Sequence, residues 1–219
     1  MTLDEIRAGL TELETSLLCD TDKALPVMDP AIRPVRNDLK LIGTAFTVAC
    51  RDDFLTVLRG LRDAAPGDVL VVDGQGGRRA LAGELFATEA ARKGLAGIVV
   101  DGAVRDVETL RTLPIPVYAR SFNPTSGTTA KLFECGVPVN CGGVVVNPGD
   151  IIFGDQDGVV VATTGRLAEL IPLAEQRRDS ETVALRRMAD GDSLFDMLNL
   201  DEHLEKVRTG EPSTLEFTI

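Results

Sequence analysis

The sequence predicts an α/β fold, a layered β/β/α sandwich with peripheral helices at its N- and C-terminal ends. Two observations lead to this prediction. Apolar β-branched runs alternate with helical segments up to about residue 121, and short apolar runs then follow one another without helices from residue 144. Strand–helix–strand units form parallel sheets, whereas closely spaced strands pair antiparallel. The chain of 219 residues suits a single domain, with a core at about 40–165 and a helical extension over 166–219.

The first fifty residues are expected to form a helix, a loop and a strand. Apolar residues recur every three or four positions over residues 3–18, which predicts one amphipathic helix. Residues 29–38 hold two prolines without periodicity and are expected to be a loop, whereas residues 41–50 are rich in β-branched side chains and are expected to be a strand. The apolar positions of the helix are Leu3, Ile6, Leu10, Leu13 and Leu17.

A strand–helix series is expected next. Asp52 or Asp53 is placed to cap a helix, residues 69–73 form an apolar strand, and a glycine-rich loop follows at 74–77. A helix over 83–93 is expected to end at Gly94, which serves as its C-terminal cap. The expected apolar face of the helix after Asp53 is Phe54, Val57, Leu58 and Leu61.

The rest of the chain passes from this series into a β-rich segment and then into helices. A strand at 97–101, a short helix at 106–111 and a short strand in "IPVYARS" are expected first. The later strands are expected at 144–147, 151–155 and 158–163, with a long charged helix at 166–189 and a final helix and tail.

Composition excludes several classes of partner. The net charge of −11 argues against nucleic acid, because phosphate binding needs clustered lysine and arginine. No segment approaches the roughly 18 apolar residues that a membrane span needs. The acidic start "MTLDEIRAGL" does not resemble a signal peptide, and the four cysteines form no C-x-x-C pair. We therefore expect a cytoplasmic protein with reduced thiols.

Charged residues gather where two of the expected strands end. Parallel strands place their strand-to-helix loops on one edge of the sheet, so Glu84, Arg105 and Asp106 are expected to meet there. Two helix N-termini at this edge would offer free N–H groups to a carboxylate. The same spacing also allows a purely structural interpretation, in which the acids only cap helices and Arg105 pairs with Asp101.

The stretches "GELFATEAARKGLAGIVVDGAVRD" and "PGDIIFGDQDGVVV" resemble the RraA-like family of swivelling-domain proteins. The shared motif is an acid, twenty residues and then Arg-Asp, here Glu84 followed by Arg105 and Asp106. The motifs "IGTAFTV" and the glycines at 74–77 are also similar, and the resemblance covers about residues 40–165.

The resemblance implies a class II pyruvate aldolase that depends on a divalent metal, Mg²⁺ or Mn²⁺. It implies that Asp106 is the direct metal ligand, that Glu84 holds metal-bound waters, and that Arg105 contacts the oxygen that gains charge as an enolate forms. Backbone N–H groups at Leu85 and Phe86 would bind the substrate carboxylate. The substrates implied are 4-hydroxy-2-oxo acids such as 4-hydroxy-4-methyl-2-oxoglutarate, and the same enolate would permit decarboxylation of oxaloacetate.

The resemblance also implies self-association as a trimer or hexamer, with an acid from the C-terminal region of a neighbouring subunit. Glu169, Glu175 and Glu181 are candidates, and for each the alternative is a solvated helix face. The family also contains non-catalytic protein-binding regulators of ribonuclease activity, which lack the acid that this chain keeps as Glu84.

Other chemistries receive little support from the sequence. "DGQGG" lacks the third glycine of a dinucleotide loop, since Arg79 occupies that position. A Schiff-base mechanism needs a desolvated lysine, and the lysines lie in polar or helix-end contexts. The single histidine, His203, lies in the charged stretch "DEHLEK" and is expected at the surface.

Overall fold

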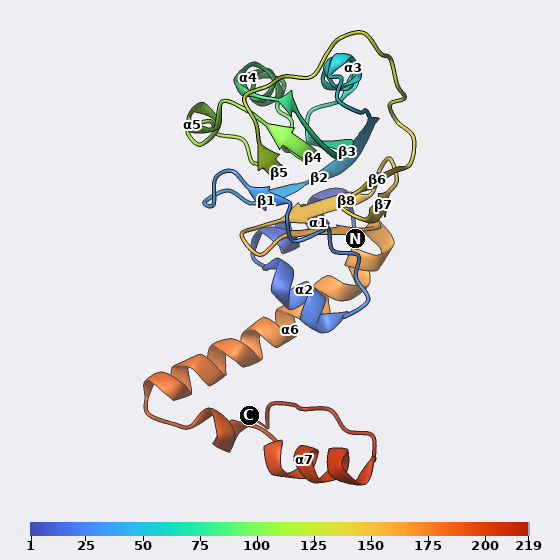
Figure 1. Ribbon diagram of the computed structural model, residues 1–219. Helices are drawn as coiled ribbons and strands as arrows, with labels where there is room; N and C mark the ends of the chain where they lie inside the picture. The colour runs from blue at the N-terminus through green and yellow to red at the C-terminus, as the bar shows by residue number, and fades with distance from the viewer. Residues whose placement is uncertain (219) are drawn as a thin grey trace. The chain divides into compact units, whose positions relative to one another are not determined.

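The structure is a computed structural model that describes residues 1–218 (Figure 1). Contacts within the chain form two compact units, Met1–Ile171 and Pro172–Ile219. The first unit contains the sheet, the N-terminal helices and the start of the long helix α6 (Thr164–Ala189), and the second contains the remaining C-terminal helices. The predicted α/β fold class is confirmed.

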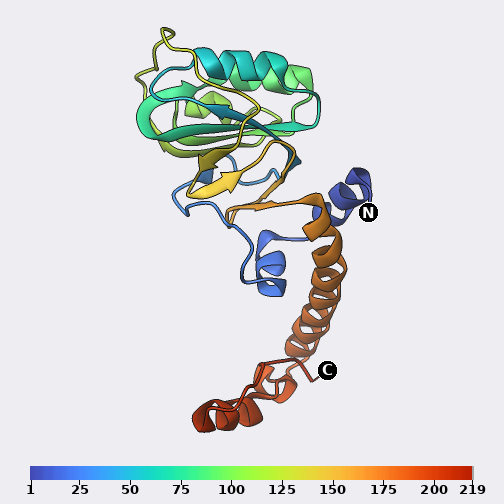
Figure 2. The same cartoon turned by 90° about the vertical axis from the view of Figure 1, so that its right-hand side faces the viewer.

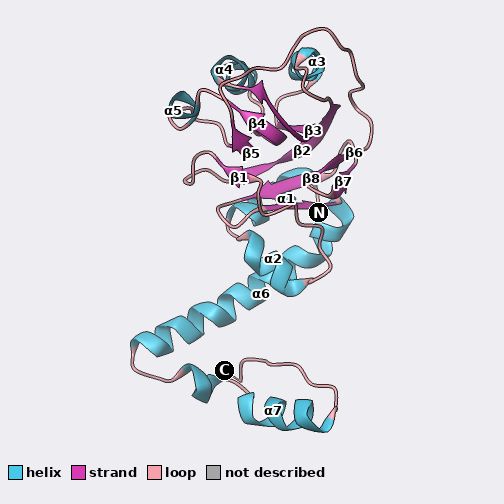
Figure 3. Cartoon of the chain, viewed as in Figure 1, coloured by secondary structure: helices cyan, strands magenta, loops and turns pink. Residues whose placement is uncertain are grey.

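One seven-stranded sheet organises the first unit, in the order β1-β5-β4-β3-β2-β8-β9. The four central strands, β2 to β5, are parallel, and the outer strands run antiparallel to their neighbours. The sheet curls so that β8 lies below the parallel strands (Figure 3). The strands are β1 (Arg33–Pro34), β2 (Leu41–Ala49), β3 (Asp68–Ala82), β4 (Gly97–Val104), β5 (Val117–Phe122), β8 (Ile151–Gly154) and β9 (Val159–Ala162).

Three helices cover the outer face of the parallel strands: α3 (Leu55–Asp63), α4 (Glu84–Lys93) and α5 (Val107–Leu110) (Figure 2). Strand side chains alternate between the two faces, so Leu70 and Val72 pack under these helices while Val69 and Val71 pack inside the curl. Both faces of β3 are therefore buried, which explains its continuous apolar run.

The inner face of the curl packs against a hairpin of β6 (Val139–Cys141) and β7 (Val144–Val146). The sequence predicted β7, whose three valines form an apolar run, but missed β6, whose sequence Val-Asn-Cys contains no such run. Four free thiols are present in the described chain, and two of them, Cys50 and Cys141, are buried.

The single helix expected over residues 3–18 is wrong. The structure has two helices, α1 (Leu3–Thr11) and α2 (Thr15–Thr21). The side chain of Asp155 accepts hydrogen bonds from the N–H and the hydroxyl of Thr15, both at 2.7 Å, and so fixes a new helix start. Leu13 in the break remains fully buried, so the apolar spacing reflected burial without a continuous helix.

The loop expected at 74–77 is also wrong, because β3 continues through it to Ala82 beside β4. Gln75 and Gly76 adopt positive φ, of 54° and 65°, and the register shifts there as in a β-bulge. A Cβ on Gly74 would lie 2.7 Å from the carbonyl oxygen of Asp101. The glycines therefore allow close strand pairing rather than ending the strand.

Other boundaries agree with the sequence to within a few residues. Helix α4 ends at Gly94, whose φ of 74° is the left-handed C-cap conformation. The side chain of Asp53 accepts a hydrogen bond from the N–H of Leu55 at the start of α3. Leu58 departs from the expected apolar face, since it is 40% exposed.

The second unit continues α6 and adds a 3₁₀ turn (Leu194–Met197) and α7 (Leu200–Thr209). His203 is half-buried rather than fully exposed, and its Nδ1 lies 2.9 Å from Oγ of Ser213. Within residues 1–218, no helix has the length and apolar character needed to cross a bilayer.

Candidate functional site

The charged residues that the sequence singled out converge at the carboxyl ends of β3 and β4. Glu84 is the first residue of α4, and Arg105 and Asp106 follow the last residue of β4. The N–H of Arg105 donates to the carbonyl of Ala82 at 3.1 Å, which extends the strand pairing up to the site. The sheet therefore brings together residues that are about twenty positions apart in the sequence.

Asp106 links the two helix starts through its carboxylate. Its Oδ2 accepts a hydrogen bond from the N–H of Glu84 at 3.2 Å and lies 3.4 Å from Nε of Arg105. Its backbone is left-handed, with φ 58° and ψ 40°, a conformation that aspartate and asparagine tolerate better than most residues. Asp106 occupies the N-cap position of α5 as the structural interpretation expected, but its side chain makes no hydrogen bond within that helix and instead accepts the N–H of the first residue of α4.

Gly83 makes this convergence sterically possible. A Cβ at this position would lie 2.5 Å from Oδ2 of Asp106 and 2.9 Å from Cγ of Arg105. Both contacts are shorter than Cβ atoms tolerate, so the side chains of Asp106 and Arg105 would both have to move. The glycine thus permits the acid and the arginine to lie directly against the start of α4.

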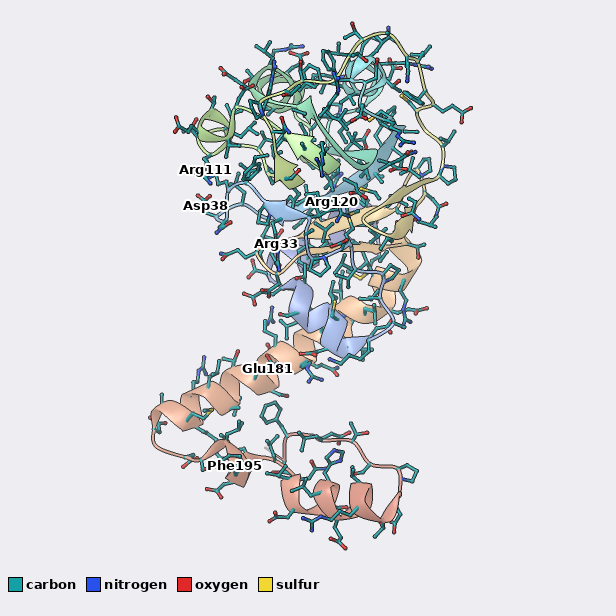
Figure 4. All side chains as sticks on the ribbon, viewed as in Figure 1. Arg33, Asp38, Arg111, Arg120, Glu181 and Phe195 are labelled. Carbon is teal, nitrogen blue, oxygen red and sulfur yellow. The ribbon has the colours of Figure 1, made fainter. Side chains whose placement is uncertain are left out.

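The alternative in which Arg105 pairs with Asp101 is wrong. Asp101 is 5% exposed, and its Oδ1 lies 2.5 Å from Nε of Arg120, a residue on β5 (Figure 4). Its Oδ2 accepts the N–H of Gly142 at 2.7 Å, and Arg120 also reaches Asp29 at 2.8 Å. Arg105 is consequently free of Asp101 and remains at the surface with Asp106.

A small hollow of about 50 Å³ opens beside Arg105 and Asp106. One wall is apolar, and the rings of Phe54 and Phe86 pack edge to face there with centroids 5.6 Å apart. The sequence did not identify Phe54 or Ser126 as site residues, since each reaches the hollow only through the tertiary fold. The lining residues are Phe54, Ala80, Leu81, Ala82, Gly83, Leu85, Phe86, Arg105, Asp106 and Ser126.

The N-terminus of α4 faces this hollow. The first N–H bonded to a carbonyl of the same helix start is that of Ala87, which donates to Gly83 at 3.1 Å. The N–H groups of Leu85 and Phe86 therefore have no acceptor within the helix, and the helix dipole favours an anion beside them. The side chain of Leu85 is 74% exposed, so only the backbone of this residue is positioned for such a ligand.

The donor set at this edge consists of two carboxylates, those of Glu84 and Asp106. Across residues 1–218, no group of three or more histidine, cysteine, aspartate or glutamate side chains is arranged to hold a metal. A fully protein-ligated zinc centre does not match this arrangement. Asp106 lines the hollow and Glu84 is exposed at the start of α4. Exposed carboxylates of this kind fit a hard ion such as Mg²⁺, which keeps several waters and takes further oxygens from the substrate.

The pKa values of two other acids, Asp73 and Asp29, are shifted in opposite directions. Burial raises the pKa of Asp73, and the nearby charge of Asp101 acts in the same direction. The N–H of Ala31 and the guanidinium of Arg120 lower the pKa of Asp29. Burial also raises the pKa of the Cys141 thiol well above its ordinary value, so this thiol is not activated as a nucleophile.

The three C-terminal acids considered from the sequence all lie on α6. Glu169 pairs with Arg166 at 2.8 Å, and Glu181 (labelled in Figure 4) pairs with Arg177 at 3.3 Å. Glu175 lies between them on the same helix and is half-buried.

Comparison with known proteins agrees with the resemblance seen in the sequence. Residues 15–161 match the family described as "RraA-like: Aldolase/RraA". A protein of Halalkalibacterium halodurans named "Putative 4-hydroxy-4-methyl-2-oxoglutarate aldolase" is 32% identical over 197 residues, which span 89% of this chain and 91% of that protein.

Solved structures give the same result. The RNA-processing inhibitor RraA from Thermus thermophilis is 34% identical with a TM-score of 0.64, covering 69% of this chain and 93% of its own. Streptomyces coelicolor RraAS2, described as an unusual member of the RNase ES inhibitor RraA protein family, is 27% identical with a TM-score of 0.75, covering 84% and 98%. The chain therefore belongs to the RraA-like family.

Proposed function

We propose that the chain is a divalent-metal-dependent carbon–carbon lyase. It cleaves 4-hydroxy-2-oxo acids to pyruvate and also decarboxylates oxaloacetate. The observation that carries this proposal is the meeting of Glu84, Arg105 and Asp106 at one edge of the sheet. Arg105 and Asp106 line the hollow, and the Asp106 carboxylate lies 3.2 Å from the backbone nitrogen of Glu84 and 3.4 Å from Nε of Arg105. The aldolase name of the relative from Halalkalibacterium halodurans supports it.

The residues present suit the charge changes of this reaction. Cleavage breaks the bond between C3 and C4, the electron pair passes to C3 to give the enolate of pyruvate, and the C4 hydroxyl loses its proton as it becomes a carbonyl. The enolate then takes up a proton at C3. The greatest need is therefore a fixed positive group beside the C2 oxygen, where negative charge develops.

Each residue has a distinct role in the proposal. Asp106 would hold Mg²⁺ or Mn²⁺ directly and Glu84 would hold it through water, while the ion would supply Lewis acidity toward the substrate oxygens. Arg105 donates to the C2 oxygen through a planar guanidinium that stays charged throughout. The N–H groups of Leu85 and Phe86 bind the C1 carboxylate and so orient the substrate.

Assembly as a trimer or hexamer is part of the proposal. Arg105 and Asp106 are both exposed in a single chain, and a neighbouring subunit would shield them from water. Glu169, Glu175 or Glu181 of that neighbour would then be available to accept the C4 proton. Decarboxylation of oxaloacetate releases no such proton, so it reports on Arg105 and Asp106 alone.

A pyruvate-release assay tests the proposal on a panel of 4-hydroxy-2-oxo acids and oxaloacetate. Activity is expected with Mg²⁺ or Mn²⁺ and should disappear with EDTA, then return when the metal is restored. Undiminished turnover after exhaustive EDTA treatment would exclude the metal-dependent mechanism. Absence of pyruvate from every substrate would instead favour a non-catalytic regulator of ribonuclease activity; the Thermus relative is described as an RNA-processing inhibitor.

A further inference from the structure

A wide groove with a volume of about 910 Å³ lies between β1 and the residues that follow α5. We call it the arginine groove, because three arginines and one acid are the charged residues that line it. Three positive charges and one negative charge give it a net charge of +2, in a chain whose net charge is −11. None of its residues lines the hollow beside Asp106. The charged residues are Arg33, Arg36, Asp38 and Arg111, and Figure 4 labels all of them except Arg36.

Two of the three arginine charges are uncompensated. Nε and Nη2 of Arg36 donate to the two carboxylate oxygens of Asp38, so this pair carries no net charge. Arg33 and Arg111 form no ion pair within residues 1–218. Because no other charged residue lines the groove, these two guanidinium groups match a ligand with two negative charges.

Backbone carbonyls hold both guanidinium groups in place. Nη1 of Arg33 donates to the carbonyl oxygens of Gln156 at 3.2 Å and Asp157 at 2.9 Å. Nε of Arg111 lies 3.4 Å from the carbonyl oxygen of Val35, on the opposite wall of the groove. A neutral carbonyl orients an arginine without cancelling its charge, and each guanidinium keeps further N–H groups for another acceptor. The groove is therefore ordered before any anion enters it, which lowers the cost of binding.

An exposed aromatic ring lies in the same groove. Phe122, the last residue of β5, lines the groove and is 53% exposed. Among the aromatic residues of the first unit, Phe122 is the one that is more than half exposed. Solvent-exposed apolar surface next to fixed cations suits a ligand that joins an anionic group to an apolar one.

We propose that the arginine groove binds a small phosphomonoester, with its phosphate between Arg33 and Arg111 and its organic part against Phe122. A phosphomonoester carries close to two negative charges at neutral pH and has three terminal oxygens, so it matches two guanidinium forks. A carboxylate has one charge and would leave one arginine uncompensated. Inorganic phosphate has the charge but has no group to place against the ring. The site is separate from the proposed lyase chemistry, and neither depends on the other.

Calorimetry at about pH 8, without metal or oxo acid, tests the assignment with three probes. Phenyl phosphate has the ring and the double charge, inorganic phosphate has only the charge, and phenyl sulfate has the ring with a single charge. Phenyl phosphate is expected to bind once per chain and about tenfold more tightly than either other probe. Equal affinity for phenyl phosphate and either other probe, or absence of phenyl phosphate binding at about 10 mM, would overturn the proposal.

Variants of the groove assign the binding to its residues. Arg33→Gln and Arg111→Gln should each weaken the binding of phenyl phosphate and of inorganic phosphate about tenfold, since each removes one charged fork. Phe122→Ala should weaken only phenyl phosphate, to the affinity of inorganic phosphate. The three side chains are exposed, so the melting temperature should stay near that of the wild type.

The matched control is Arg78→Gln. Arg78 is exposed and also forms no ion pair within residues 1–218, but it lies outside the groove. Its replacement should change phenyl phosphate binding less than about twofold. A loss in Arg78→Gln equal to that in Arg111→Gln would show that phosphate responds to the overall charge of the chain, and would overturn the proposal.

Two other outcomes would also overturn it. The start of α4 favours anions as well, so Arg105→Gln is measured with phenyl phosphate and should bind it as the wild type does. Loss of binding in Arg105→Gln, without any dependence on Arg111, would place the phosphate at the hollow. If the wild type binds no phosphate and light scattering shows a lower oligomeric mass for Arg33→Gln and Arg111→Gln, the groove is an interface between copies of the chain.

Discussion

Two aspartate–arginine pairs include residues on β4 or directly after it, and they differ in contact distance and in exposure. The Asp101–Arg120 pair has a contact of 2.5 Å and side chains that are 7% and 25% exposed. The Asp106–Arg105 pair has a contact of 3.4 Å and side chains that are 39% and 43% exposed. The first ties β4 to β5 and to the hairpin through Gly142, whereas the second faces open space. Burial, and not residue type, separates the structural pair from the pair available to a ligand.

Asp106→Asn is the change expected to have the largest effect on function. It removes the proposed direct metal ligand, so pyruvate release should be abolished and Mg²⁺ binding should weaken strongly. Asparagine tolerates the left-handed backbone and keeps an oxygen for the Glu84 N–H, so the melting temperature should stay unchanged. Glu84→Gln is the matched control. It should lower the rate of pyruvate release by only about 10- to 100-fold, because Glu84 acts on the metal through water. An Asp106→Asn variant that still releases pyruvate would contradict the role of Asp106 as the direct metal ligand.

Arg105→Lys is expected to lower kcat for oxaloacetate decarboxylation by about 10²–10³-fold. Lysine retains the charge but loses the planar fork that faces the developing enolate. Because Arg105 is exposed, the melting temperature and the affinity for Mg²⁺ should change little. Both quantities should be measured on one preparation. A stable and fully active variant would end the catalytic role of Arg105, and a destabilised but active one would make it a structural residue like Arg120.

Asp101→Asn is expected to have the reverse signature. It leaves the Arg120 guanidinium without its closest carboxylate in a mostly buried position, which should lower the free energy of unfolding by about 3 kcal/mol. Activity per folded molecule should stay near that of the wild type, because Asp101 does not line the hollow. Urea denaturation compared with turnover at low temperature measures the two effects separately. Loss of turnover in a fully folded variant would show that the two pairs are coupled.

Asp73→Asn is expected to have the smallest effect, a slight stabilisation near neutral pH. Burial raises the pKa of Asp73 in the folded chain, so ionisation costs folding free energy as pH rises through that raised value. At pH about 3, below the ordinary aspartate pKa, both states are protonated and the variant should match the wild type. Urea denaturation at about pH 7 and about pH 3 measures this difference. A variant that is less stable near pH 7 would show that the bond to the N–H of Gln75 outweighs the cost of burying the charge.

The sequence predicted what depends on local chemistry. Gly94 was expected to end α4 because a left-handed C-cap favours glycine, and the structure shows that conformation. The meeting of Glu84, Arg105 and Asp106 followed from the geometry of parallel strands and is observed. Their catalytic roles remain a prediction.

What the sequence missed depends on contacts between distant segments. The partner of Asp101 is fixed by the pairing of Val100 with Ala119, which places Arg120 beside it. The extension of β3 through 74–77 follows from its pairing with β4, and the break before Thr15 follows from Asp155. Spacing along one segment does not contain this information.

Gly83 has a consequence for how such a site changes during evolution. Its side of the backbone is filled by Asp106 and Arg105, so a single added methyl group would displace the acid and the arginine together. Replacement of Gly83 alone would therefore inactivate a related protein that still carries the acid, the arginine and the aspartate at the positions of Glu84, Arg105 and Asp106. A survey of relatives that counts only the charged motif would class that protein as an enzyme, whereas one that also records the residue before the acid would not.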